Sequence, residues 1–431
     1  MKKSFSNLIL LIVLTSIFSA CSSTKNSSTD ENKDQLQSAW SNYYKAIADV
    51  EQEFVNSKIY QLDTIHQTGA YELLSMLIAA NQNFIMSDPD YTNFHHMENP
   101  LRRIGIDNPD NFYRSANVWN PDGKHVYRIW GNRGTTADFL METFYGADPN
   151  GAIAVLEDEE MKLNEDGSFE VYLSATREEY MENWMKLDQD PRIFALIVRS
   201  NYAEWEKEKH GDVYIERIGM TGVRYQGTTI SGLVQRINNA QQVMERQGKF
   251  WPDFAWKMTL MKKNTLMKFQ ATGEIGILSQ KSSYGYWELE DDEALIVKLK
   301  EVNAGYCGFQ TLNFWGSSPD WRNKFTSLSW GRNGKSQALK SNDGYYYIVI
   351  SKNDPGIQNW IETSGMKKGV MTLRVQSLKN MEFEFKPITK VVKLSDIQDN
   401  LPKDIPSFST AQRTQQLKNR QQHALDRYTY W

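Results

Sequence analysis

The sequence contains few cysteines and no marked excess of charge of either sign. Its 431 residues include only two cysteines, Cys21 and Cys307, and the formal net charge is −4. This balance gives no reason to expect a nucleic-acid partner, because such binding depends on clustered positive charge. If Cys21 carries a lipid, Cys307 has no partner and no intramolecular disulfide forms. Cys307 lies in an apolar stretch, where we expect a buried and unreactive thiol.

The motifs of the common catalytic and metal sites are also missing. There is no G-x-S-x-G elbow, P-loop or dinucleotide fingerprint, and the six histidines form no H-x-H, H-x-x-E-H or H-E-x-x-H pattern. His95 and His96, beside Glu98, are the one candidate metal group. Adjacent side chains diverge on regular structure, so usually at most one of the two imidazoles would point inward. We therefore expect no metal site and no cofactor.

Four acidic residues in predicted loops are the first to consider as catalytic carboxylates: Asp107, Asp110, Asp354 and Glu362. Catalytic carboxylate pairs of glycosidases are defined by their separation in space, so the sequence cannot select them. Aspartates in turns mostly accept hydrogen bonds from their own backbone, and we expect that role here.

Long apolar runs are absent except near the N-terminus. Lysines at positions 2 and 3 precede an apolar stretch over residues 8–17, which is too short for a stable membrane span. The tetrapeptide at 18–21, Phe-Ser-Ala-Cys, resembles a bacterial lipobox with Phe in place of the usual Leu. The prediction is a lipoprotein signal peptide over 1–20 and a lipid on Cys21; the alternative is an ordinary secretory signal cut after Ala20. Ser22 favours the outer membrane of a Gram-negative cell envelope.

Aromatic residues are abundant, at 12% of the chain with 13 Trp and 21 Tyr. We interpret them first as the cores of aromatic-rich β-sandwiches. The alternative is an aromatic-lined cleft for sugar rings or flat apolar molecules.

Apolar periodicity and turn residues divide the chain into segments. Expected helices include one beginning at 36, one over 69–86, and one that begins after Thr228 and Thr229 and ends at Gly248 and Pro252. Residues 176–210 are expected to be helical around a strand at 193–198, and 274–278 is expected to be a strand. The predicted order is a tether (21–35), an N-terminal helical region (36–90), a first β-sandwich half (91–227), a helical insert (228–270), a second half (271–395) and a C-terminal helix (396–431).

The stretch 345–375 carries the most distinctive pattern, in which a strand, an Asn-Asp-Pro-Gly turn and a second strand follow one another. Its signature residues are Asp354, Pro355, Gly356, Asn359, Trp360, Glu362, Thr363, Gly365 and Gly369. Further matching residues are 107–110 with Tyr113, 127–131, Arg199 with Trp205 and Glu208, Phe309 to Trp315, and Arg413, Arg420 and Arg427.

With these residues the chain resembles the bacterial domain-of-unknown-function family 1214 over about 100–428. The resemblance implies β-sandwich domains of jelly-roll type and no established catalytic residues. The predicted fold class is therefore mainly β with helical inserts: a double β-sandwich of jelly-roll type with an N-terminal helical hairpin, a mid-chain helical insertion and a C-terminal helix.

Six residues are the candidates for ligand binding: Tyr113, Arg114, Arg199, Asn313, Trp315 and Trp360. The planar guanidinium of Arg114 or Arg199 suits a carboxylate, sulfate or phosphate. The competing interpretation is an internal ion pair with Asp107 or Asp110. The tryptophans suit either a cleft or a sandwich core.

Together these features predict a lipid-anchored envelope protein that binds a glycan-like or flat apolar small molecule in an aromatic-lined cleft. A carboxylate-dependent hydrolase or lyase and a purely structural envelope protein are the alternatives, and fold analogy cannot choose among the three.

Overall fold

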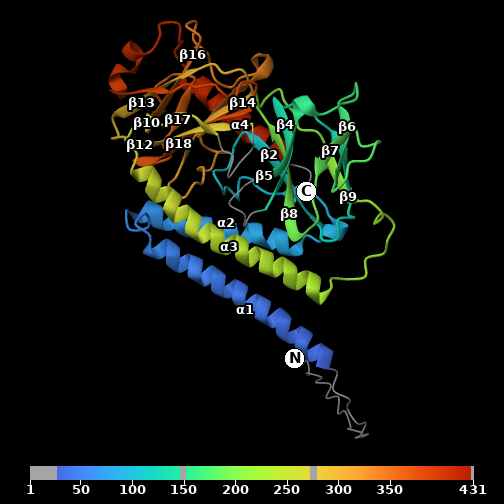
Figure 1. Cartoon of the computed structure of the whole chain (residues 1–431). Helices are drawn as coiled ribbons and strands as arrows, with labels where there is room; N and C mark the ends of the chain where they lie inside the picture. Colours follow the sequence, from blue (N-terminus) through green and yellow to red (C-terminus); the bar gives the residue numbers. More distant parts are fainter. Residues whose placement is uncertain (1–26, 146–151, 272–278, 429–431) are drawn as a thin grey trace, which may run out of the picture.

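The computed structural model describes residues 27–145, 152–271 and 279–428, and it shows two β-sandwich halves above a layer of helices (Figure 1). The predicted signal peptide, Cys21 and the strand expected at 274–278 lie outside these residues. The mainly β fold with helices near the N-terminus, in mid-chain and near the C-terminus is confirmed. Its jelly-roll connectivity stays a prediction.

The first half consists of two sheets. One has the order β1 (His95–His96), β2 (Asn111–Asn120), β8 (Asp190–Asn201), β4 (Asp138–Phe144), β5 (Ala152–Glu157), and the other β7 (Asn183–Lys186), β6 (Ser168–Ser174), β3 (Tyr127–Asn132), β9 (Val213–Arg217). Phe194, Leu196 and Val198 of β8 pack in the core between these sheets. Because side chains alternate along a strand, Ala195, Ile197 and Arg199 lie on the opposite face.

The second half repeats this two-sheet plan. One sheet has the order β10 (Thr265–Leu266), β12 (Lys281–Glu288), β18 (Lys368–Leu378), β14 (Ala304–Leu312), β15 (Ser327–Gly331), with β11 (Gln270–Ala271) paired to β12. The other has the order β17 (Trp360–Glu362), β16 (Tyr345–Ser351), β13 (Glu293–Lys300), β19 (Ile388–Lys393). Cys307 is fully buried between the sheets, as predicted, and burial raises the pKa of its thiol.

Residues 183–186 and 190–201 form strands, and no helix lies between the described residues 176 and 210, so the prediction of helices around 193–198 is wrong. The strand at 193–198 is confirmed and extends over the whole of β8, which pairs with β2 on one side and β4 on the other. Two flanking partners satisfy the backbone of β8 on both edges, and this outweighs the helical propensity of the charged residues before it.

Three helices form the layer that covers one end of both halves: α1 (Ser27–Asn56), α2 (Thr64–Met86) and α3 (Ile230–Thr259). Since α1 begins at Ser27, residues 27–35 are helical, not part of a tether. A helix held by a packed apolar stripe extends into polar residues at little cost. None of the helices in the described ranges combines the length and apolar composition that crossing a bilayer requires.

The middle helix begins as predicted but does not end where predicted. The Thr229 hydroxyl accepts a hydrogen bond from the Gly232 amide (3.1 Å) and caps the first turn of α3. The helix then continues through Gly248 and Pro252 to Thr259. A Cβ at Gly248 would lie 2.4 Å from Val50 Cγ2 on α1, so this glycine permits close helix packing instead of ending the helix.

The last helix, α4 (Thr410–Arg427), starts with the predicted capping box of Ser409 and Gln412. Its three arginines are buried instead of lying on a solvated face. Arg413 pairs with Asp354 (2.8 Å), and Arg420 donates to the Trp321 carbonyl (2.5 Å). The Arg427 guanidinium donates to the Pro109 carbonyl (2.7 Å). This helix therefore ties the second half to the first through its polar side chains.

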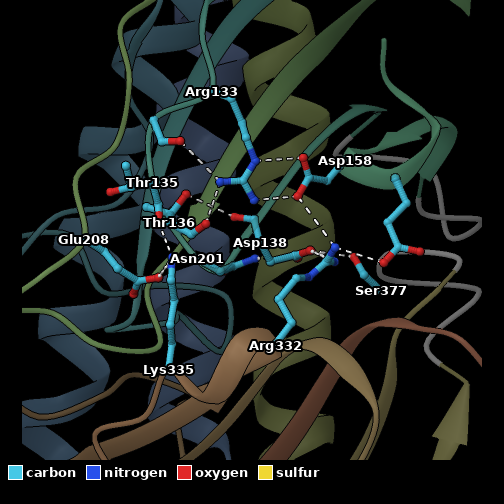
Figure 2. Close-up of polar contacts among 12 residues, drawn as sticks. Arg133, Thr135, Thr136, Asp138, Asp158, Asn201, Glu208, Arg332, Lys335 and Ser377 are labelled. Atoms are coloured by element: carbon cyan, nitrogen blue, oxygen red, sulfur yellow. Dashed lines mark hydrogen bonds and ion pairs between the residues drawn. The ribbon is translucent and has the colours of Figure 1, made fainter. Parts of the chain in front are cut away.

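The two halves are also joined by a buried polar network (Figure 2). At its centre Asp138 accepts hydrogen bonds from Ser377 Oγ (2.7 Å) and Asn201 Nδ2 (3.2 Å), and it pairs with Arg332 (3.3 Å). At one side Lys335 of the second half pairs with Glu208 of the first (3.0 Å). These contacts fix the two inward sheet faces opposite one another, and the candidate site lies between them.

Candidate functional site

A cavity of about 600 Å³ lies between the two halves, with α2 and α3 on its helical side. Strands β2, β4 and β8 of the first half contribute the face that points away from their own core. Strands β12 and β18 of the second half contribute Tyr284 and Arg374. The segment from His95 to Ile106, together with residues 270, 271 and 280 of the second half, supplies the rest of the wall. The volume is within the range of small-molecule sites in proteins.

Much of the wall is apolar. Phe84 from α2 packs with Ile197 and Phe144 of the first sheet, and Phe250 and Trp251 come from α3. The alternation of side chains along β8 explains this. Every second side chain points away from the sandwich core and faces the cavity. Such a surface suits the apolar body of a ligand.

Arg199 and Glu142 form an ion pair in the wall, with side chains that are 16% and 2% exposed. Both Arg199 Nε (2.8 Å) and Nη2 donate to Glu142 Oε1, while no partner for Glu142 Oε2 exists among the described residues. Burial alone would lower the pKa of Arg199, but the Glu142 carboxylate outweighs it and the pKa is raised. The guanidinium also lies 5.1 Å from the centre of the Tyr113 ring.

A second acid, Glu98, is 8% exposed in the loop after β1. Burial raises its pKa well above the usual value, helped by Asp107 and opposed by Arg199 and Arg374. Its Oε2 has no hydrogen-bond partner in the described part of the chain. In its uncharged form, which burial favours, this acid can both donate and accept a hydrogen bond.

Arg374 stands on β18 opposite this acid. Its Nη2 donates to the backbone carbonyls of Ile106 and Asp107. Its Nη1 has no partner among the residues that the structure describes. The cavity therefore combines an apolar body with four lining residues that have a buried polar atom without a partner in the described part of the chain: Asn81, Glu98, Glu142 and Arg374.

The structure brings together only two of the six predicted ligand-binding residues, Tyr113 and Arg199. Arg114, the next residue on β2, points to the opposite face and lines a separate cavity of about 450 Å³ with His96 and His210. It donates to the Gly211 carbonyl and to Ser200 Oγ (3.4 Å). The predicted ion pairs with Asp107 or Asp110 are wrong for both arginines.

The other three candidates lie elsewhere. Asn313 Oδ1 accepts from the Ser317 amide (3.0 Å) within a turn. The Trp315 indole donates to the His66 carbonyl (2.8 Å) where the second half packs on the helical layer, and Trp360 packs with the second-half core. These two tryptophans therefore serve packing and do not line the cavity.

The four acids considered from the sequence have protein partners. Asp107 accepts from the Ser318 amide (2.8 Å), Asp110 from the Tyr306 hydroxyl (2.8 Å), and Glu362 from the Phe325 amide (2.8 Å). Only Asp354 accepts from its own turn, at the Gly356 amide (2.9 Å). The prediction of local backbone partners is wrong for the first three, whose partners come from distant segments.

Sequence reasoning missed Glu142 and Arg374 and considered Glu98 only as a metal ligand. A usable signal was present: Glu142 stands within the strand sequence FLMETF and Arg374 within VMTLRV, so each is one charge among apolar neighbours. A charge in such a strand must either reach solvent or meet a partner.

The candidate metal group at His95 and His96 finds no support. In the described ranges, no group of three or more His, Cys, Asp or Glu could hold a metal ion. Burial lowers the pKa of the His95 imidazole to about 4.

Comparisons with known proteins support the family resemblance and the fold. Residues 122–203 match the family described as Protein of unknown function (DUF1214), which confirms the predicted resemblance over this part of the first half. The signature residues at 354–369 lie outside the matched segment. A crystal structure of an uncharacterized protein from Burkholderia cenocepacia is similar, with a TM-score of 0.74 and 24% identity over 84% of this chain and 99% of that chain. A protein from Vibrio parahaemolyticus matches with a TM-score of 0.42 and 12% identity over 84% of this chain and 100% of that one. No curated protein matches the chain.

Proposed function

We propose that this protein binds a small molecule with a flat, apolar body in the 600 Å³ cavity between its two halves. The observation that carries the proposal is the coincidence of an apolar wall with buried, unpartnered polar atoms of Glu98, Glu142 and Arg374. Each buried polar atom without a partner costs about 1–3 kcal/mol, so a purely structural protein would gain stability by replacing these residues. A ligand that supplies the missing partners accounts for their presence.

The chemistry of the wall favours a flat apolar ligand over a glycan. A glycan presents hydroxyl groups around its whole ring and needs polar partners on several sides. The apolar side chains of Phe84, Phe144 and Ile197 form one group. On the paired strands β4 and β8, Glu142 and Arg199 lie toward one end and Phe144 and Ala195 toward the other. This arrangement suits one apolar body with a polar group at one end.

A hydrolase or lyase is a second candidate, because two carboxyl groups line the same cavity. Burial raises the pKa of Glu98 and favours its uncharged form, and Glu142 is paired with Arg199. Two carboxyl groups in unlike environments are the usual starting point for general acid and base roles. Any ligand found to bind should therefore be re-examined by mass spectrometry for turnover.

The test of binding is a thermal-shift panel on the full-length protein with sterols, fatty acids, neutral and acidic aromatic compounds, and oligosaccharides. A ligand at 100 times its Kd should add about 2.7 kcal/mol to the free energy of unfolding. Ile197→Trp should remove the response by filling the cavity, and Ala271→Trp, at an exposed lining position, should reduce it. The matched control Ile218→Trp, at a residue 45% exposed, should respond like the wild type. A response that survives both cavity variants contradicts the proposed site.

We further propose that the protein is held in the cell envelope, at the outer membrane of a Gram-negative bacterium, by a lipid on Cys21. The lipobox-like sequence at 18–21 supports this, and Cys21 lies outside the described residues. Two or three acyl chains on one residue suffice for stable anchoring. Cys21→Ser should move the protein from the membrane fraction to the soluble fraction of lysed cells. Retention of this variant in the membrane fraction would contradict lipid anchoring.

A further inference from the structure

No carboxylate within ion-pair distance of Arg374 is found in the described part of the chain. The residue is 6% exposed, and the carboxyl groups of Glu98 and Asp107 interact with its charge only at longer range. Two backbone carbonyls, of Ile106 and Asp107, accept from Nη2, and Nη1 is left without a partner. A buried cation in this position is costly unless an anion or several acceptors surround it.

Other buried arginines of this protein are compensated in one of two ways. Arg199 and Arg413 each pair with a carboxylate, Glu142 and Asp354 respectively. Arg420 has no carboxylate partner, but its guanidinium lies 4.2 Å from the centre of the Trp205 ring. Arg374 has neither kind of partner among the described residues, and it faces the cavity.

Resting on the proposed function, we infer that the ligand carries a carboxylate, which binds Arg374 Nη1 while its apolar body lies against Phe84, Phe144 and Ile197. The ligand class is therefore an aromatic or long-chain aliphatic acid. A carboxylate supplies a charge-assisted hydrogen bond and neutralises the buried guanidinium, which a neutral polar group cannot do.

Glu98 fits the same ligand. As an uncharged acid it can donate its O–H to the second oxygen of a bound carboxylate, so that both ligand oxygens have donors. Ionised carboxyl groups on both partners would repel one another, so the neutral state of Glu98 is the one compatible with an acidic ligand. Glu142 does not compete for Arg374, because Arg199 holds it.

The experiment compares two pairs of probes that differ only in the acid: 2-naphthoate with 2-naphthamide, and dodecanoate with dodecanamide. Affinities for the full-length protein are measured by isothermal titration calorimetry at pH 7. The acid of at least one pair should bind about tenfold more tightly than its amide, the gain of a charge-assisted over a neutral hydrogen bond. Arg374→Gln should bring this ratio close to one while amide binding persists. Arg374→Lys should retain a preference for the acid.

The controls separate the failure of this inference from the failure of the proposed function. Arg128→Gln removes a partly exposed arginine on β3 and should leave the acid-to-amide ratio unchanged. Equal binding of acid and amide by the wild type, or an acid preference that survives Arg374→Gln, overturns the carboxylate inference and leaves the cavity function standing. Binding of no member of either pair, together with a flat thermal-shift panel, overturns both. Should Arg374→Gln fail to fold, the wild-type ratio and Arg374→Lys decide the outcome.

Discussion

Glu142→Ala should lower the free energy of unfolding by about 3–5 kcal/mol, because it leaves the Arg199 guanidinium buried without its carboxylate. Glu142 is 1% exposed, and its Oε1 accepts from Arg199 Nε at 2.8 Å. The remaining contacts of Arg199 are both with Tyr113: Nη1 lies 3.5 Å from the hydroxyl, and the guanidinium lies 5.1 Å from the ring centre. Both are long, so they offset only a small part of the loss. The cost therefore arises from an uncompensated charge, with the lost hydrogen bonds as a smaller contribution.

Chemical denaturation followed by circular dichroism measures this effect, and two variants control it. In Glu142→Leu/Arg199→Met both charges are removed with similar side-chain volume, and stability should largely return to that of the wild type. Glu170→Ala breaks the ion pair between Glu170 (40% exposed) and Arg128 (39% exposed). It should lower the free energy of unfolding by no more than about 1 kcal/mol. If Glu142→Ala costs as little as Glu170→Ala, the charge at Arg199 is not buried in solution.

The double variant also bears on function. If the Arg199–Glu142 pair served only stability, a well-packed apolar pair would replace it without further effect. The cavity position of Glu142 Oε2 predicts instead that ligand response in the panel changes when the pair is removed. Stability and binding thus respond differently to the same substitution, which separates a structural from a ligand-contacting role.

Local patterns predicted much of the fold, since they depend on neighbours in the sequence. The Thr229 cap, the Ser409 capping box and the strand at 193–198 each follow from a few adjacent residues, and each is confirmed. Errors occurred where a distant segment decides the outcome. Gly248 would end an isolated helix, but here the lack of a side chain lets Val50 of α1 pack directly against the α3 backbone.

The candidate site was predicted only in part for the same reason. The sequence singled out Tyr113 and Arg199 by their residue types and surroundings, and alternation along a strand places both on one face. Nothing local indicates that β18 of the second half lies across the cavity from β8 of the first. The meeting of Arg374 with Glu98 depends on how the halves dock, which the network around Asp138 fixes.

That network predicts an unusual dependence of stability on pH. Asp138 is fully buried, and burial raises its pKa from 3.8 to about 6 against the opposing effects of Ser377 and Arg332 (Figure 2). Between these values the folded protein keeps a proton that the unfolded chain has lost, so the free energy of unfolding falls as pH rises. At about 1.36 kcal/mol per pH unit, the interval from 3.8 to about 6 amounts to about 3 kcal/mol.

Asp138→Asn removes this titration while keeping the shape of the side chain. The free energy of unfolding of the variant minus that of the wild type should therefore rise by about 2.4 kcal/mol between pH 4 and pH 7, since part of the total of about 3 kcal/mol falls below pH 4. Asp343→Asn provides a control of opposite sign: hydrogen bonds from Tyr347 and Lys298 outweigh desolvation and lower the pKa of Asp343 to about 2. Its difference from the wild type should fall between about pH 2 and pH 4 and stay nearly constant from pH 4 to pH 7, so the denaturation curves must extend below pH 4. Denaturation curves at four pH values measure both differences. If the difference for Asp138→Asn stays constant, the Asp138 carboxyl group has the same pKa in the folded protein as in the unfolded chain.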